Sequence, residues 1–163
     1  MKRTPFLSTA AAAGTALAAP RYTLAAGPAA TVKIGFLESF SGVFSDLGGV
    51  HKIGAQLALA DQNKSGRVRF EFAFGDDGSN PATGTTEARR LIAQEGVDVL
   101  YGGTSSAVGG ALEPLTLDAG IFNLSLGPQD SSLTGAKASK LTYRFGPNVR
   151  MLLGPVLRRA LAL

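Results

Sequence analysis

Two adjacent serines, Ser105 and Ser106, are the residues of this 163-residue chain whose type and position most directly suggest chemistry. They follow Gly102 and Gly103, which end a short apolar run that begins at Val97. Where a buried strand runs straight into a helix, the free amides at the helix start attract a carboxylate or phosphate. Glycines let the main chain approach such a group, and serine hydroxyls donate hydrogen bonds to it. The pattern predicts an anion-binding turn, and an ordinary strand-to-helix turn capped by serine is the alternative.

The composition argues against several other kinds of site. Cysteine is absent, which excludes disulfides, thiolate catalysis and cysteine-bound metals. His51 is the only histidine and has no carboxylate cluster at ligand spacing. We therefore predict no catalytic residue, no metal and no cofactor, and we interpret His51 as a partly exposed helix residue. The net charge is +4, but the basic residues form no stripe with aromatic residues, so nucleic-acid binding is not expected.

Residues 1–30 have the layout of an export signal. Lys2 and Arg3 give a positive start, and a mild apolar stretch with small-residue cleavage sites follows. The apolar stretch is too short for a stable membrane span. Thr4 stands where a twin-arginine signal would have its second arginine, so both the general secretory route and the twin-arginine route stay open. We expect a periplasmic protein whose mature part is residues 31–163.

The rest of the chain alternates strand and helix patterns. Apolar or period-two runs predict strands at residues 31–38, 68–74, 97–101, 121–125 and 141–145. Apolar spacings of three and four and the Asn80-Pro81 start signal predict helices at residues 46–63, 80–96, 105–119 and 149–163, with a polar loop at 127–140. The alternating pattern of residues 68–74 indicates a strand near the sheet edge. The order predicts an α/β fold with a parallel, doubly wound sheet.

Several short motifs occur in a characteristic order along this predicted fold. They are KIGFL at 33–37, FSG at 40–42, GAQLALA at 54–60, DDGSNPAT at 76–83, ARRLI at 88–92, GVDVLYG at 96–102, SSA at 105–107 and AGI at 119–121. With these motifs the chain resembles the N-terminal lobe of a type I periplasmic binding protein. Within that class it resembles the branched-chain amino-acid (leucine-binding) group that serves ABC importers. The resemblance covers nearly all of residues 32–149.

This resemblance implies a non-enzymatic protein that binds a small solute, such as a branched-chain amino acid, in a cleft between two lobes. Its partners would be an ABC permease and an ATPase. By position, Ser105 and Ser106 would receive the solute's carboxylate, and the loop 126–130 would hold its amino and carboxylate groups. The implied ligand-binding residues are Ser41, Gly103, Thr104, Ser105, Ser106, Gly127, Pro128 and Gln129. Pro128 and Gln129 replace the small residues usual in the family, so another small polar solute is the alternative to an amino acid.

Three further expectations follow from the same residues. Asp76 and Asp77 are expected to shape the turn before Asn80 rather than to contact the ligand. The resemblance implies a second, C-terminal lobe that has no counterpart in this sequence, so we expect a truncated protein or a separately encoded partner lobe. We also expect the apolar stripe of the last predicted helix to lack part of its cover.

Other protein classes fit the sequence less well. A receptor's ligand-sensing domain would share the fold. A serine hydrolase that used Ser105 or Ser106 would need a nucleophile elbow, and the last glycine of that pattern is missing here. It would also need an acid and a histidine in the right order after the serine, and these are absent. A nucleotide-binding domain would lack both the G-x-G-x-x-G and the Gly-Lys-Ser/Thr patterns.

Overall fold

Five parallel strands form one sheet in the order β2-β1-β3-β4-β5. The computed structural model describes residues 30–64 and 68–162, so the predicted export signal lies outside the described residues except for Ala30. The strands are β1 (Ala30–Glu38), β2 (Val68–Asp76), β3 (Val99–Gly102), β4 (Phe122–Ser125) and β5 (Thr142–Arg144). The helices are α1 (Ser45–Lys64), α2 (Pro81–Ala93), α3 (Ser106–Ala119) and α4 (Val149–Leu161), with a 3-10 turn, η1 (Ser131–Thr134). The predicted doubly wound α/β fold is confirmed, and β2 lies at the sheet edge as its pattern predicted.

One face of the sheet is closed by α2 and α3. Leu37 of β1, Leu91 of α2 and Leu100 of β3 are all 0% exposed and belong to one apolar cluster. Asn80 caps α2, because its side-chain oxygen accepts from the amides of Ala82 and Thr83. This face is the hydrophobic core of the described residues.

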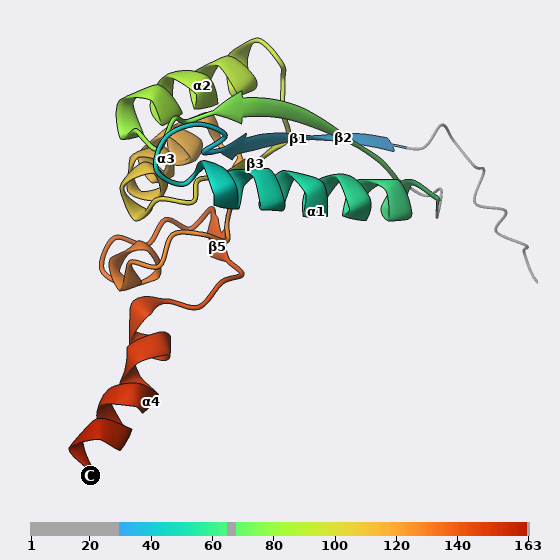
Figure 1. The fold of residues 1–163 in the computed structure, drawn as a ribbon. Helices are drawn as coiled ribbons and strands as arrows, with labels where there is room; N and C mark the ends of the chain where they lie inside the picture. Colours follow the sequence, from blue (N-terminus) through green and yellow to red (C-terminus); the bar gives the residue numbers. More distant parts are fainter. Residues whose placement is uncertain (1–29, 65–67, 163) are drawn as a thin grey trace, which may run out of the picture.

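The opposite face of the sheet carries an aromatic cluster under α1. Side chains alternate across a strand, so Phe36 points away from the core that its neighbour Leu37 enters. The Phe36 ring stacks on Tyr101 with centroids 4.5 Å apart and also packs against Phe72 and Phe74. Figure 1 shows α1 and α2 on opposite sides of the sheet. α1 buries only Gly48, so its predicted apolar stripe stays largely exposed.

The last helix, α4, forms where the sequence predicted it but buries none of its residues. Asn148 caps it by accepting a hydrogen bond from the Met151 amide at 3.0 Å. Figure 1 shows α4 projecting away from the sheet. Its apolar residues are exposed, among them Leu152, Leu153 and Val156. The incomplete cover expected for this helix is therefore observed.

The strand order places a switch point between β1 and β3. The chain leaves β1 toward the sheet edge at β2 and returns to pair β3 with the other side of β1. In open α/β sheets the loops at such a point diverge and leave a crevice at the carboxyl ends of the strands. The loops after β1, β3 and β4 therefore meet at one end of this sheet.

Candidate functional site

A pocket of about 500 Å³ lies at the carboxyl ends of the strands. One side comes from the turn between β3 and α3, residues 104–106, and from the loop after β4, residues 126, 127 and 129. The other side comes from Phe44, Leu47 and His51, at the start of α1, and the segment after β5 adds Gly146 and Pro147. This pocket, called the switch-point pocket below, occupies the position where ligands bind in doubly wound folds.

Ser105 and Ser106 both line the switch-point pocket. Ser105 is the N-cap of α3, and its Oγ accepts from the Ala107 amide at 3.2 Å. The Oγ of Ser106 accepts from the amides of Gln129 and Asp130 at 3.0 and 3.2 Å. A serine hydroxyl has two acceptor lone pairs and one donor hydrogen. Because backbone amides occupy the acceptor side of each hydroxyl, the hydrogens can still be donated to an anion in the pocket.

Three further predicted residues, Thr104, Gly127 and Gln129, line the same pocket. The loop after β4 lies directly against the turn after β3. A Cβ on Gly127 would stand 2.6 Å from the Cα of Thr104, so only glycine permits this approach. The structure therefore brings together two predicted binding segments that are more than twenty residues apart in the sequence.

The remaining predicted residues, Ser41, Gly103 and Pro128, do not line the switch-point pocket. The Ser41 amide donates to Asp76 Oδ1 at 3.1 Å, which ties this exposed residue to the neighbouring turn. Gly103 is buried and supplies a φ of 74° that the turn requires. Pro128 is buried against Gly109. All three shape the loops around the pocket.

Asp76 and Asp77 organise the turn before α2, as predicted. Asp77 Oδ1 accepts from the Ser39 hydroxyl at 2.5 Å and from the Ser79 amide at 2.7 Å. Burial would raise the pKa of the Asp76 carboxyl. Hydrogen bonds from the Gly78 amide, from the hydroxyl and amide of Ser41, and from the Phe40 amide outweigh that effect and lower the pKa below its usual value.

No sequence pattern indicated the pair formed by His51 and Glu38. Glu38 ends β1 and is 0% exposed, and its Oε1 lies 3.3 Å from Nδ1 of His51. The hydroxyl of Thr104 donates to the other carboxylate oxygen. His51 is a half-buried helix residue, in line with its interpretation as partly exposed, yet it also lines the same pocket as Ser105 and Ser106. Among the described residues, the hydrogen-bond partner of the His51 ring is Glu38 and not either serine.

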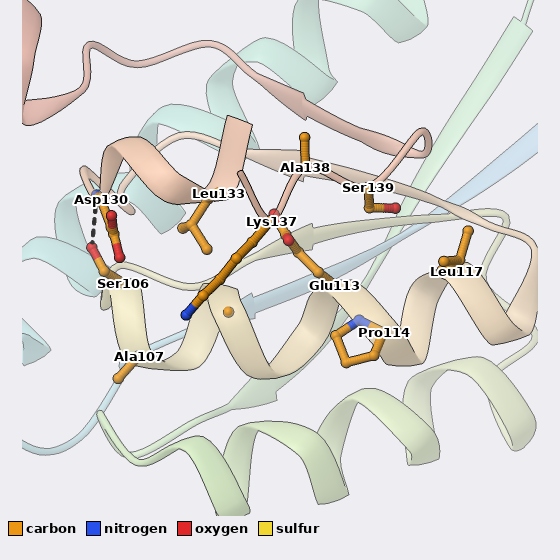
Figure 2. Close-up of a pocket in the computed structure, with 11 residues that line it drawn as sticks. Ser106, Ala107, Glu113, Pro114, Leu117, Asp130, Leu133, Lys137, Ala138 and Ser139 are labelled. Carbon is orange, nitrogen blue, oxygen red and sulfur yellow. Dashed lines mark hydrogen bonds between the residues drawn. The ribbon is translucent and has the colours of Figure 1, made fainter. Parts of the chain in front are cut away.

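A second pocket of about 700 Å³ lies between α3 and the segment 130–139. Figure 2 shows Ser106 at one end of this pocket, where its hydroxyl oxygen accepts a hydrogen bond from the Asp130 amide. The Lys137 side chain extends over α3. Glu113 lines this pocket, is 5% exposed, and leaves its Oε1 without a hydrogen-bond partner among the described residues. Burial raises the pKa of Glu113, although the positive charges of Arg144 and Lys137 oppose the shift.

A comparison with protein families decides the class of this chain. Residues 31–162 match the model of a family described as periplasmic binding protein. The chain belongs to this family. The resemblance stated from the sequence motifs is thereby confirmed. The family is one of solute-binding proteins and not of enzymes.

Curated relatives carry names that refer to amino-acid binding. A Leu/Ile/Val-binding protein homolog 8 from Brucella suis is 35% identical over 142 residues, which are 85% of this chain and 33% of the relative. A Leu/Ile/Val-binding protein homolog 7 from Brucella abortus is 33% identical over 130 residues, 77% of this chain and 32% of the relative. The chain thus spans about a third of the length of these relatives.

Solved structures share the fold. A branched-chain amino acid transporter substrate binding protein from Streptococcus pneumoniae, in complex with isoleucine, is 26% identical with a TM-score of 0.67. The match covers 72% of this chain and 34% of that protein. A solute binding protein of an ABC transporter from R. palustris, in complex with 4-hydroxybenzoate, is 26% identical with a TM-score of 0.70 over 80% of this chain and 36% of that protein.

Within residues 30–64 and 68–162, no helix combines the length and apolar character needed to cross a membrane. In the same residues, no group of three or more histidine, aspartate or glutamate side chains is placed to hold a metal ion.

Proposed function

We propose that residues 31–163 form the first lobe of the solute-binding component of an ABC importer, and that the switch-point pocket binds the carboxylate of its solute. The observation that carries this proposal is the pair of serines whose hydroxyl hydrogens remain available at the start of α3. Hydroxyl donors and the positive end of a helix dipole both favour an anion there.

The solute class follows from what the similar proteins have in common. The ligands in their crystal structures include isoleucine and 4-hydroxybenzoate, which differ in side group but share a carboxylate. A branched-chain amino acid is the first candidate, because the curated relatives are named for Leu, Ile and Val binding. An aromatic acid is the second candidate, because the pocket also has apolar walls at Phe44, Leu47 and Leu126.

The proposal places the protein in the periplasm, after export directed by residues 1–30. A permease and an ATPase would be its transport partners, and a second lobe would close over the solute by a hinge motion. One lobe surrounds only part of a ligand, whereas a working pocket buries most of it. We therefore expect a single lobe to bind its solute weakly.

Nuclear magnetic resonance of the full ¹⁵N-labelled chain tests the proposal at such weak affinity. Isoleucine, leucine, valine, benzoate and 4-hydroxybenzoate are each titrated, and the amide signals of Ser105, Ser106 and Gly127 are followed. We expect saturable shifts with at least one acid. The Ser105→Ala, Ser106→Ala double variant should weaken binding, because each hydrogen bond to a charged group contributes about 1.5–3 kcal/mol.

Ser139→Ala is the matched control for the double variant. Ser139 lines the second pocket beside α3 and also accepts a backbone hydrogen bond, from the Leu141 amide at 3.2 Å. This control should leave the titration unchanged. The proposal is wrong if no acid shifts the three amides, or if Ser139→Ala weakens binding while the double serine variant does not.

A further inference from the structure

His51 is the only ionisable side chain among the described residues that line the switch-point pocket. The other polar side chains there are the neutral groups of Thr104, Ser105, Ser106 and Gln129. Hydrogen bonds in which one group is ionised are shorter and stronger than neutral ones. A carboxylate that enters this pocket therefore has one side chain available as a cationic partner.

Glu38 determines which way the His51 ring presents its two nitrogens. A carboxylate can only accept hydrogen bonds, so Nδ1 of His51 is the donor across the 3.3 Å to Oε1 of Glu38. The Thr104 hydroxyl fixes the same carboxylate from the other side. Nε2 of His51 has no hydrogen-bond partner among the described residues. It is also absent from the buried polar atoms that lack a partner, which means that Nε2 is accessible to solvent.

The groups around His51 make its charge decisive for an incoming anion. β1 contributes the buried carboxylate of Glu38, and β3 contributes Tyr101. Burial and the charge of Glu38 raise the pKa of Tyr101, so its phenol stays neutral. The loop after β4 contributes the apolar Leu126. On α1 itself, the Lys52 ammonium lies 4.8 Å from the Phe74 ring centroid and so is engaged away from the pocket.

We propose that His51 is a specificity-determining residue for acidic solutes: its protonated ring, backed by Glu38, donates from Nε2 to the solute's carboxylate. With a neutral imidazole, the solute's carboxylate would face the buried negative charge of Glu38 without compensation. With an imidazolium, that charge is offset. Because Nδ1 already carries the proton that faces Glu38, Nε2 can donate only when the ring is protonated, so binding of a carboxylate at Nε2 is coupled to proton uptake by His51. This inference rests on the proposed function, because it concerns the same pocket.

The test uses the full chain and exploits its single histidine. Because the sequence has one histidine, one set of imidazole signals reports on His51 without assignment ambiguity. Benzoate and its uncharged analogue benzamide are titrated at about pH 6 and about pH 8, with the Ser105 and Ser106 amides and the His51 ring signals observed together. We expect benzoate to bind about tenfold more weakly at the higher pH, and benzamide to show no pH dependence.

Two variants separate the role of His51 from a general charge effect. His51→Gln should bind benzoate with the wild-type affinity of the higher pH at both pH values. Lys52→Gln removes a neighbouring cation that lies over Phe40 and Phe74 outside the pocket, and it should keep the pH dependence. Isoleucine serves as the acid in the same design if benzoate does not bind.

The outcomes distinguish this inference from the proposed function. If an acid shifts the serine amides with equal affinity at both pH values, or leaves the His51 ring signals unmoved, the role of His51 is wrong and the proposed function stands. If the pH dependence persists in His51→Gln, the role of His51 is also wrong. If no acid shifts the serine amides at either pH, both proposals are wrong.

Discussion

The two faces of the sheet both carry apolar residues but differ in how they are covered. On the face that α2 and α3 close, Leu37, Leu91 and Leu100 are 0% exposed. On the face under α1, the helix residues Val50, Ile53 and Leu57 keep 61–66% of their surface exposed. The first face is a closed hydrophobic core. The second face carries an aromatic cluster with α1 beside it.

This difference shows where the stability and the candidate site of the chain come from. Burial of apolar surface stabilises a fold roughly in proportion to the area removed from water. The closed face, with its fully buried leucines, therefore contributes strongly to the folding free energy of the described residues. The switch-point pocket lies where the two faces meet, with Ser105 and Ser106 at the start of a helix of the closed face and His51 on the helix of the open one.

Truncating one leucine on each face is the most direct way to break the comparison. Leu91→Ala removes a fully buried side chain from the closed face and should lower the free energy of unfolding by about 2–5 kcal/mol. Leu57→Ala, whose side chain is 64% exposed on α1, should lower it by less than about 0.5 kcal/mol. Urea denaturation of the full chain measures both. Equal losses would show that the α1 face is covered in solution, and the comparison would be wrong.

Two adjacent glycines of α1 sharpen the comparison at the start of that helix. A Cβ on Gly48 would stand 2.1 Å from the carbonyl oxygen of Ser39, whereas a Cβ on Gly49 would meet nothing within 4 Å. Gly48→Ala should therefore destabilise the chain by about 1–3 kcal/mol, as α1 is pushed off the strand end. Gly49→Ala should stabilise it by about 0.5–1 kcal/mol through helix propensity. Thermal denaturation compares the two.

The same glycine pair carries a consequence for the pocket. Gly48 holds the first turns of α1 against Ser39, and His51 follows one turn later. If Gly48→Ala shifts the His51 ring signals and Gly49→Ala does not, the close approach at Ser39 positions the imidazole. Unchanged ring signals in both variants would contradict that dependence.

Local patterns were sufficient to predict the elements of this fold but not their cover. The near-continuous apolar run of β1, the alternation of β2 and the Asn80-Pro81 start of α2 each depend on a few neighbouring residues, and all three predictions are confirmed. The same kind of pattern predicted apolar stripes on α1 and α4. Whether a stripe is buried depends on a partner element, and periodicity does not encode one.

The candidate site divides in the same way. Ser105 and Ser106 follow a strand directly, so their place at its carboxyl end could be predicted. The pairing of His51 with Glu38 could not, because it depends on the rotation and tilt with which α1 leaves β1. Pro128 occupied a predicted position in the loop after β4, yet it packs against Gly109 instead of lining the pocket. Tertiary packing decided which residues of each predicted loop face inward.

The smallest expected effect concerns the free-energy cost of burying Glu113 of α3 on the closed face. Burial raises the pKa of Glu113 above its ordinary value of 4.5, so the folded chain binds this proton more tightly than the unfolded chain does. Stability therefore falls as pH rises from the unfolded pKa through the folded pKa, and the penalty is complete above the folded pKa. Glu113→Gln removes the charge and should stabilise the chain by roughly 0.5–1 kcal/mol at neutral pH.

The pH profile of that variant separates burial from net charge. The advantage of Glu113→Gln should shrink as the pH falls toward the unfolded pKa, because the wild-type carboxyl is then neutral as well. Asp118→Asn makes the same change in net charge at an exposed position of α3, and its effect should not follow this profile. Denaturation midpoints across the acidic range measure both variants. If Glu113→Gln destabilises the chain at neutral pH, the fold stabilises Glu113 as a carboxylate. The positive charges of Lys137 and Arg144 then outweigh the effect of its burial.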